Sequence, residues 1–367
     1  MHRAHKISLD PTRAQVRYFR KACGCARVAY NWALDHVRKR LDAGELVENQ
    51  YELKQLFNKV KKDLFPWMSE VTKCAPEGAL MNFEKARRNF FAKRSKFPTH
   101  HKKGVNDSFM VANDAFRCES KKAYIPKLGS VRMREPLRFT GKIMRGTVKC
   151  ETDRWFLVVC VELPDPVPPL RDSQTVGVDL GIKALATLST GETVEGPKAL
   201  AKTLARIKRL NRTVSRRKKG SNRRRKAVKL LAKAHCRVKC IRQDHLHKLT
   251  TRLAKQYSVV GIEDLNVKGM VKNKKLGRQL SDQSFGEFRR QLEYKAPTFG
   301  SKIIVTDRFY PSSKTCNCCG YKNEMLALSH RHWVYDQCGS RHDRDVNAAV
   351  NLMKLAVGLT VNARGAG

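Results

Sequence analysis

Apolar residues recur at helical spacing along most of the first 95 residues. From Val16 to Val37 they fall three or four positions apart, and similar patterns cover about 48–64 and 78–93. Asp10 before Pro11 places a capping type of residue ahead of a proline that suits a first helical turn. The preceding residues favour a short extended segment. The N-terminal part is therefore predicted to be a basic helical lobe after an initial strand.

The pattern changes to short β-branched and aromatic runs between residues 108 and 163. Runs at 123–125, 130–133 and 155–161 predict a small, mostly antiparallel sheet or barrel. The proline-rich segment 164–169 cannot continue a strand ladder and indicates a linker. Beyond it, three short runs between residues 175 and 194 predict a strand meander.

A long basic helical stretch follows the meander, with an interruption near Gly220. Residues 202–255 hold 21 Lys or Arg and a single acid, Asp244. A solvated helix face would mix both signs of charge, so this excess predicts a surface that binds phosphates. The whole chain agrees, with 75 Lys and Arg against 33 Asp and Glu and a formal charge of +42. Nucleic acid is the partner that such a charge favours.

Composition also bounds the class of protein. The 367 residues, 41% of them hydrophobic, predict two or three lobes with real cores. No apolar run of about 18 residues predicts a membrane span, and the basic start of the sequence does not resemble a signal peptide. We therefore expect a cytoplasmic, nucleoid-associated protein with no membrane partner. Its 12 cysteines are then expected to be thiols or metal ligands before disulfides.

Three acidic residues occupy positions where the sequence pattern predicts buried apolar side chains. Asp179 interrupts the apolar run 176–182, and Glu263 ends the apolar run 259–263. Asp345 falls in the first turn of a predicted helix, on the side of its apolar residues. Any one of these acids alone could be a cap or a strand-end residue. Asp343, just before, is better placed to cap the same helix.

Together the three acids predict a metal site. Isolated carboxylates in such places are costly unless they are paired or bind a cation. Carboxylates without Cys or His suit Mg²⁺ or Mn²⁺, and two such ions on a phosphate can support an in-line displacement. The chemistry indicated is metal-dependent phosphodiester hydrolysis at Asp179, Glu263 and Asp345.

The cysteines near the C-terminus indicate a zinc knuckle. Cys316 and Cys319 form a CxxC pair, and Cys338-Gly339 follows as half of a second knuckle. Tyr335 stands where a complete second CxxC would begin. If one structural Zn²⁺ binds, Cys316, Cys319 and Cys338 are its expected ligands, with Asp336, His332 or water as the fourth. The alternative is a ribbon held by packing alone.

These motifs resemble those of a known family. Residues 176–182 and 261–267 resemble the first and second RuvC motifs, and 311–316 followed by 342–352 resembles the zinc ribbon and third motif of TnpB proteins. TnpB proteins are encoded by insertion sequences and are relatives of the type V CRISPR effectors. Weaker similarity, for example at 9–12 and Tyr30-Asn31, extends the resemblance over nearly the whole chain.

The resemblance implies an α/β and α+β fold of several lobes. It comprises an RNase H-like RuvC nuclease domain with a zinc-ribbon insertion, and a β-barrel wedge domain that carries a helical recognition lobe. The implied segments are the first wedge strand (1–10), the recognition lobe (11–106), the wedge β-barrel (107–165), the RuvC-like domain with its basic helical insertion (166–310), the zinc-ribbon-like segment (311–342), and the third-motif helix with the C-terminal tail (343–367).

The resemblance also implies a function. An RNA-guided endonuclease would cut double-stranded DNA beside a short transposon-adjacent motif, with one protein chain per guide RNA transcribed from the transposon end. A backbone-held RNA–DNA heteroduplex requires many Lys and Arg and little base readout, which fits the charge. Three alternatives remain: a nuclease-inactive RNA-guided repressor, a strand-transfer transposase, and a plain RNA-binding protein. The three filled carboxylate positions disfavour the first, and the last leaves the carboxylates unexplained.

Overall fold

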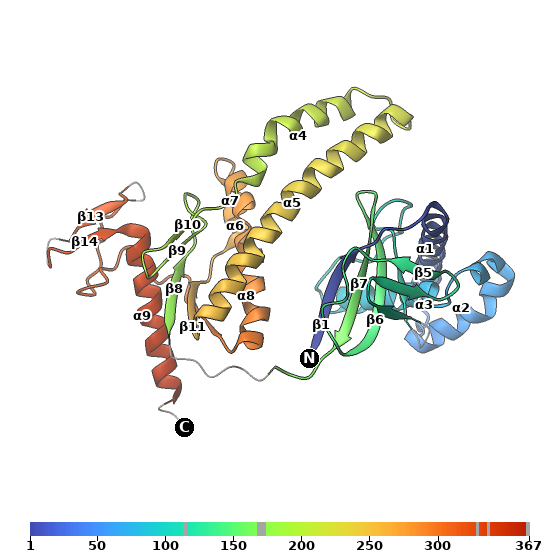
Figure 1. The fold of residues 1–367 in the computed structure, drawn as a ribbon, viewed down its shortest axis with the longest axis horizontal. Helices are drawn as coiled ribbons and strands as arrows, with labels where there is room; N and C mark the ends of the chain where they lie inside the picture. The colour runs from blue at the N-terminus through green and yellow to red at the C-terminus, as the bar shows by residue number, and fades with distance from the viewer. Residues whose placement is uncertain (113–115, 167–173, 328–329, 336–337, 365–367) are drawn as a thin grey trace. The chain divides into compact units, whose positions relative to one another are not determined.

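The computed structural model describes residues 1–112, 116–166, 174–327, 330–335 and 338–364 (Figure 1). The chain divides into two compact units, Met1–Asp165 and Pro166–Gly367. The predicted linker 164–169 spans this division, and its residues 167–169 lie outside the described ranges. No helix among the described residues is long and apolar enough to cross a membrane.

The first unit combines helices with two antiparallel sheets. One sheet has the strand order β1-β7-β6-β2 and the other β3-β4-β5. The elements are β1 (His2–Ser8), α1 (Arg13–Asp42), α2 (Gln50–Leu64), a 3-10 turn (Pro66–Glu70), α3 (Cys74–Phe91), β2 (Ser108–Val111), β3 (Arg117–Glu119), β4 (Lys122–Ile125), β5 (Gly129–Arg132), β6 (Lys142–Glu151) and β7 (Arg154–Glu162). Helices and strands share one core, in which Phe19 of α1 packs on Trp155 of β7 with ring centroids 4.9 Å apart.

The start of α1 differs from the prediction. Thr12, not Asp10, is the N-cap, because its Oγ1 accepts a hydrogen bond from the Gln15 backbone N–H at 3.3 Å. Gln15 Oε1 accepts one from the Thr12 N–H in return, at 2.9 Å. These reciprocal bonds form a capping box. Asp10 is still engaged in the preceding β-structure, where its backbone N–H donates to the Arg132 carbonyl at 2.9 Å.

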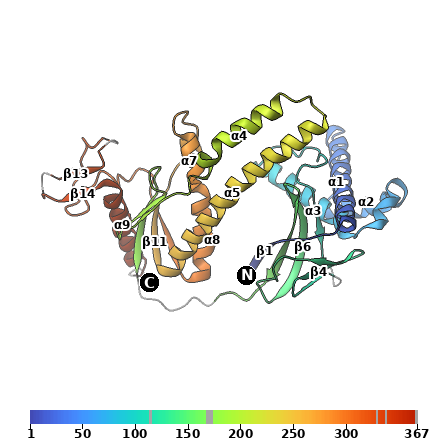
Figure 2. The ribbon, with the colours of Figure 1, turned by 45° about the horizontal axis from the view of Figure 1, so that its top comes forward.

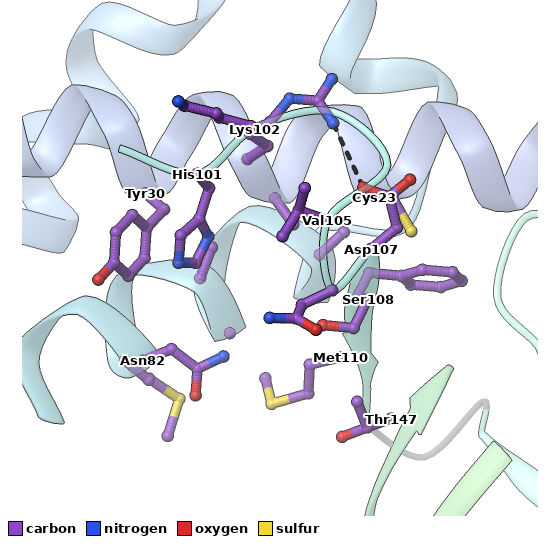
Figure 3. A pocket seen from close by; sticks show the side chains of 18 of the residues that line it. Cys23, Tyr30, Asn82, His101, Lys102, Val105, Asp107, Ser108, Met110 and Thr147 are labelled. Atoms are coloured by element: carbon purple, nitrogen blue, oxygen red, sulfur yellow. Dashed lines mark ion pairs between the residues drawn. The ribbon is translucent and has the colours of Figure 1, made fainter. Parts of the chain in front are cut away.

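A cavity of about 190 Å³ lies among α1, α3, β2, β6 and the segment 101–108 of the first unit (Figure 3). Tyr30 stacks on His101 beside it, with ring centroids 3.7 Å apart. Arg27 pairs with Asp107 across 3.7 Å. None of the predicted catalytic or metal-binding residues lines this cavity, so the candidate chemistry belongs to the second unit.

The second unit is built on a mixed sheet with the strand order β10-β9-β8-β11-β12. β8 (Thr175–Asp179), β9 (Ala186–Leu188) and β10 (Thr193–Val194) form the antiparallel meander that the sequence predicts. β11 (Val259–Glu263) runs parallel to β8 on one side and to β12 (Lys302–Thr306) on the other. The remaining elements are α4 (Ala199–Ser215), α5 (Asn222–Gln256), α6 (Val267–Val271), α7 (Gly277–Gln283), α8 (Phe285–Phe299), β13 (His332–Val334), β14 (Arg341–Asp343) and α9 (Arg344–Arg364).

Helix α9 packs on one face of this sheet, and α5 and α8 lie on the other (Figures 1 and 2). Two strand glycines allow α9 to approach the sheet. A Cβ on Gly177 of β8 would stand 1.8 Å from the Ala349 carbonyl oxygen, and one on Gly261 of β11 would stand 2.7 Å from that of Leu352. The helix therefore rests directly on strand backbone.

Helices α4 and α5 form the basic stretch as a helical hairpin (Figures 1 and 2). Ser221 caps α5 by accepting a hydrogen bond from the Arg224 N–H at 3.1 Å, so the predicted break near Gly220 is confirmed. A narrow apolar seam that includes Ile207 and Val238 joins the helices. Most of the remaining surface is charged or polar, as the sequence pattern predicts.

The base of this hairpin is held by one carboxylate. Asp282 of α7 accepts hydrogen bonds from the backbone N–H of Leu200, at the start of α4, at 3.1 Å. Its Oδ1 also lies 2.7 Å from Arg242 Nε of α5. Asp282 is nearly fully buried, so this is a charge-assisted contact in a shielded place.

Candidate active site and metal centre

The sheet brings the first two predicted acids side by side. Val178 of β8 pairs with Ile262 of β11 in a parallel register. Asp179 and Glu263 are the next residues of the two strands, at the same ends. In neighbouring parallel strands, residues at equivalent positions lie at the same edge of the sheet, so the two carboxylates lie together at that edge.

The third acid comes from helix α9. Asp345 lies in its first turn, and Ala349, Leu352 and Ala356 on the same side are buried against the sheet. Asp343 caps the helix, since its Oδ1 accepts from the backbone N–H groups of both Asp345 and Val346 at 3.0 Å. The predicted capping role of Asp343 is therefore confirmed, and Asp345 remains the predicted third ligand.

Glu263 and Asp345 act electrostatically on the Asp179 carboxylate. Burial raises the pKa of Asp179 to about 8, and the charges of Glu263 and Asp345 contribute in the same direction. Arg344 and Arg331 act against this rise of the Asp179 pKa but do not cancel it. Repulsion among clustered carboxylates is the condition that a bound cation relieves. Among the described residues, Asp179, Glu263 and Asp345 do not form a group whose oxygens all lie within 4.8 Å of one another, so a divalent cation shared by the three acids stays a prediction.

Two contacts of these acids were not foreseen from sequence. Arg331 Nη1 donates to the Asp345 carboxylate, 3.0 Å from Oδ1 and 3.3 Å from Oδ2. Ser312 Oγ donates to Glu263 Oε1. Both Arg331 and Ser312 come from the segment between β12 and α9, so the ribbon contributes to the surroundings of the carboxylates. Ser312 lies in a recognised motif, whereas no sequence signal singles out Arg331.

Two asparagines attach the cysteine knuckle to α9. Asn347 and Asn351, one turn apart, each donate to the Thr315 carbonyl at 2.7 Å. Asn351 also donates to the Ser312 carbonyl at 2.8 Å. In return, Asn347 Oδ1 accepts from the Asn317 N–H at 2.9 Å. The knuckle is thus fixed to the same helix that carries Asp345.

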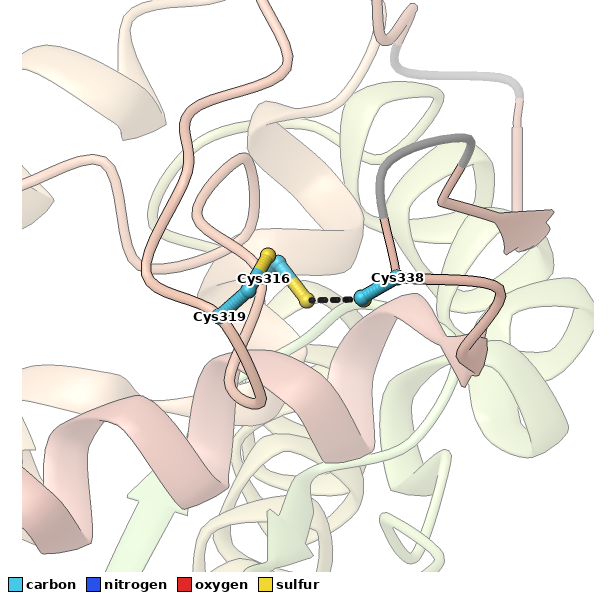
Figure 4. A group of neighbouring side chains, drawn as sticks. All are labelled: Cys316, Cys319 and Cys338. Carbon is cyan, nitrogen blue, oxygen red and sulfur yellow. Dashed lines mark hydrogen bonds between the residues drawn. The ribbon is translucent and has the colours of Figure 1, made fainter.

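The structure brings the three predicted zinc ligands together. The sulfurs of Cys316, Cys319 and Cys338 lie within 4.8 Å of one another, and those of Cys316 and Cys338 are 3.7 Å apart (Figure 4). A second group shares Cys316 and adds Cys318 and His342. Thiolates and imidazole are donors that zinc accepts in proteins, and the two groups have only Cys316 in common.

Of the side chains predicted as a fourth ligand, the structure describes only His332. His332 is 81% exposed and lies 3.8 Å from Asp343, outside both groups of donor atoms. Asp336 lies outside the described residues. His342, which lies in the third motif, has its Nε2 3.1 Å from Cys316 Sγ and groups with Cys316 and Cys318 but not with Cys319 and Cys338.

The raised pKa of Asp179 predicts a pH-dependent stability. A free aspartate ionises near pH 4, so across about pH 4 to 8 the folded chain retains a proton that the unfolded chain has lost. Stability of the metal-free protein should therefore fall as pH rises through this window. Asp179→Asn removes the effect and should stabilise the metal-free protein at pH 8 by a few kcal/mol, with little gain at pH 4. Thermal unfolding across pH 4–9 measures this.

Asp264→Asn is the matched control. Asp264 directly follows Glu263, but Arg289 and Arg308 hold its pKa below the ordinary value. The ion pairs of Asp264 contribute to the free energy of unfolding above the ordinary aspartate pKa, and this contribution is lost as the pH falls through the lowered pKa. Asp264→Asn should therefore not stabilise the protein at pH 8. Equal stability of wild type and Asp179→Asn from pH 5 to 9 would contradict the carboxylate cluster.

Comparison with known protein families gives three matches along the chain. A family described as "Probable transposase" (OrfB_IS605) matches residues 158–274. The "Cas12f1-like, TNB domain" matches residues 285–352, which include the cysteine knuckle. A "Helix-turn-helix domain" of the OrfB_IS605 group matches residues 1–45, which here form strand β1 and the single long helix α1.

Relatives and solved structures agree with these matches. A Streptomyces pristinaespiralis protein named "Putative RNA-guided DNA endonuclease" is 38% identical over 100% of this chain and 91% of its own. The Escherichia coli K12 protein named "Putative RNA-guided DNA endonuclease InsQ" is 30% identical over 99% and 94%. A Cas12f1–sgRNA–target DNA complex has a similar fold, with a TM-score of 0.62 at 14% identity over 93% of this chain and 83% of that one. The chain therefore belongs to the TnpB family of OrfB_IS605-type, transposon-encoded proteins.

Proposed function

We propose that this protein is an RNA-guided, metal-dependent endonuclease that hydrolyses double-stranded DNA at one RuvC-type site, next to a short transposon-adjacent motif. The observation that carries the proposal is that Asp179 and Glu263 end neighbouring parallel strands, while Asp345 lies in the first turn of the helix that packs on those strands and acts electrostatically on Asp179. The relatives named as RNA-guided DNA endonucleases support the substrate and the guide.

Asp179, Glu263 and Asp345 would hold Mg²⁺ or Mn²⁺. Such ions supply Lewis-acid stabilisation of phosphate charge and lower the pKa of bound water. The chain's own residues set the position of the carboxylates. Ser312 orients Glu263 through a hydrogen bond, Asp343 fixes the helix start that carries Asp345, and Arg331 offers a cation that can pass from Asp345 to an incoming phosphate.

The α4–α5 hairpin is the surface proposed for the nucleic-acid backbone. Its 21 basic residues between 202 and 255 stand against one acid, and that acid, Asp244, is already paired with Lys248 at 2.7 Å. Phosphate recognition without base readout suits a heteroduplex whose sequence is read by pairing to the guide. In this assignment one chain binds one guide RNA in the cytoplasm, associated with the nucleoid.

The segment boundaries follow from the same proposal. The first unit would comprise the wedge strand 1–10, the recognition lobe 11–106 and the wedge barrel 107–165. The second would comprise the RuvC-like domain 166–310, the ribbon 311–342 and the third-motif segment 343–367. The division between the compact units after Asp165 supports the central boundary.

Cleavage should depend on the guide. In Mg²⁺, the purified protein–RNA complex should cut a plasmid that matches its guide and leave the same plasmid uncut with a scrambled guide, because base pairing supplies the specificity. Mismatches near the adjacent motif should reduce cutting most, since the heteroduplex starts there. A plasmid-linearisation assay with paired guides measures both effects.

Varying the salt concentration distinguishes non-specific DNA binding from guided DNA cleavage. Binding of unrelated duplex DNA to the RNA-free protein should fall steeply with salt, about 10³-fold or more between 50 and 200 mM if six or more phosphates are contacted. Equal cutting with matched and scrambled guides, or full cutting after RNase treatment, would refute guide dependence. Joined rather than hydrolysed DNA ends would favour the strand-transfer alternative.

A further inference from the structure

The turn that follows β12 presents a phenylalanine to solvent. Phe309 stands three positions after Thr306, the last residue of β12, and its side chain is 87% exposed. A single exposed apolar side chain is ordinary on a protein surface, so exposure alone gives Phe309 no role. The ring is isolated, because the preceding residues Asp307 and Arg308 are also exposed and are charged. A protein partner would need a wider apolar patch than this one ring.

Phe309 is held near the predicted nuclease carboxylates by contacts on both sides of it in the chain. Arg308, the residue before it, donates to the Asp264 carboxylate at 2.6 Å and to the Asp264 backbone carbonyl at 3.1 Å. Ser312, three residues after it, donates to Glu263 Oε1. Three residues span at most about 11 Å. Phe309 therefore lies at the edge of the sheet where strand β11 ends with Glu263.

Short-range hydrogen bonds fix the backbone of this turn. The Phe309 N–H donates to Asp307 Oδ1 at 2.7 Å, and the Tyr310 N–H donates to the Asp307 carbonyl at 3.2 Å. The Ser312 N–H donates in turn to the Tyr310 carbonyl at 2.9 Å. An aspartate whose side chain accepts from the backbone two residues later is a common way of ordering a turn. The ring is therefore presented on a pre-ordered backbone, which lowers the entropic cost of binding a ligand.

An isolated aromatic ring beside cationic side chains suits an unpaired nucleobase. Bases of single-stranded nucleic acid stack on aromatic rings, while the neighbouring phosphates favour Arg and Lys. Arg308 directly precedes the ring, and Arg331 Nη1 lies 3.0 Å from Asp345 Oδ1. Both guanidinium groups reduce the negative charge that a phosphate strand would meet at the acids. Only a base that has left the duplex stack offers a free face to the ring.

Guided DNA binding produces such bases on one strand. The target strand pairs with the guide RNA, and the other strand is displaced as a single strand. We propose that Phe309 stacks on a base of the displaced DNA strand and so holds the adjoining phosphate at the site of Asp179, Glu263 and Asp345. This role presupposes the proposed nuclease function, to which it adds a residue that contacts the substrate. Because every base has an aromatic face, the contact is independent of sequence, as guide-directed cutting requires.

The contact can be measured without cleavage. Phe309→Trp introduces an indole at the turn, and Asp179→Ala in the same chain keeps the bound DNA intact. This double variant is assembled with guide RNA and matched duplex DNA. Its fluorescence is compared with that of Asp179→Ala alone, which contains the four natural tryptophans of the chain. The introduced indole should be quenched when the displaced strand carries bases, and should emit more strongly when that strand is abasic over the guide-matched region.

Cleavage rates test whether the ring acts through the base. Under single-turnover conditions, Phe309→Ala and Phe309→Leu should cut the normal displaced strand at least about fivefold more slowly than wild type, since stacking of one base has that value or more. Phe309→Trp and Phe309→Tyr retain an aromatic face and should cut at nearly the wild-type rate. On the abasic strand, wild type should slow to the rate of Phe309→Ala. Thermal unfolding of Phe309→Ala should match that of wild type, because the side chain is exposed.

Three results would overturn the stacking role. These are equal emission of the introduced indole with the base-bearing and the abasic strand, equal slowing by Phe309→Ala on both strands, and a wild-type cutting rate in Phe309→Leu. A wild-type complex that leaves its matched target uncut would instead refute the proposed nuclease function, and the role of Phe309 with it. Matched cutting by wild type is therefore established first, so that the two failures are distinguished.

Discussion

Replacing Asp179, Glu263 or Asp345 by alanine is expected to abolish guided DNA cleavage while RNA and DNA binding remain. Burial raises the pKa of Asp179, and Glu263 and Asp345 add to this rise, so each change removes one acid from the proposed metal site. Losing a single preorganised charge-stabilising group costs about 10²–10³-fold in rate, and loss of metal should cost more. Plasmid cleavage and gel-shift binding on the same preparations measure the two properties.

Asp343→Ala is the control for this series. Asp343 is adjacent to the site but acts as the cap of α9, and loss of a cap costs about 1 kcal/mol of stability. Cleavage by this variant should persist at reduced thermal stability. An essential Asp343 together with a dispensable Asp345 would show that the third metal ligand has been assigned to the wrong acid.

Gly177→Ala is expected to disrupt the second unit. Its Cβ would stand 1.8 Å from the Ala349 carbonyl oxygen and 2.5 Å from the Met353 nitrogen, both backbone atoms that cannot rotate away. Either α9 or β8 must shift, at a cost of about 3 kcal/mol or more. Because Asp179 follows two residues later and Asp345 lies on α9, cleavage should fall as well. Thermal unfolding and limited proteolysis measure the loss of structure.

Gly286→Ala is the matched glycine control. Gly286 is an exposed residue of α8, and a Cβ there meets nothing within 4 Å. In a helix this change should be neutral or stabilising by up to about 1 kcal/mol. A Gly177→Ala protein as stable and active as Gly286→Ala would mean that α9 does not rest on the strand backbone.

The carboxylates could be predicted from sequence because each breaks a local pattern. An acid that ends or interrupts an apolar run, as Asp179 and Glu263 do, can be recognised without knowing which residues it contacts in the folded chain. The cap of α1 was predicted wrongly because Asp10 and Thr12 are both capping types of residue. Only the Gln15 side chain, three residues after Thr12, distinguishes them.

Contacts between distant segments could not be predicted. Arg331 meets Asp345 because β13 and β14 fold back on the start of α9, and nothing in the neighbourhood of Arg331 in sequence signals this. The contact of His342 with Cys316, 26 residues earlier, likewise depends on how the segment that contains β13 and β14 folds back on the cysteine knuckle. Sequence spacing identifies a set of donors, whereas selection among histidines requires knowing which one points inward.

Asp282 links the two helices of the basic hairpin at their base. Asp282 holds the first turn of α4 and a side chain of α5 at the same point, so the two helices cannot separate there without breaking both contacts. The 35 residues of α5 continue from the hairpin tip to the layer beneath the sheet without a break. The two helices are therefore tied to one residue at their base, and α5 continues this connection without interruption into the helix layer that packs on the sheet.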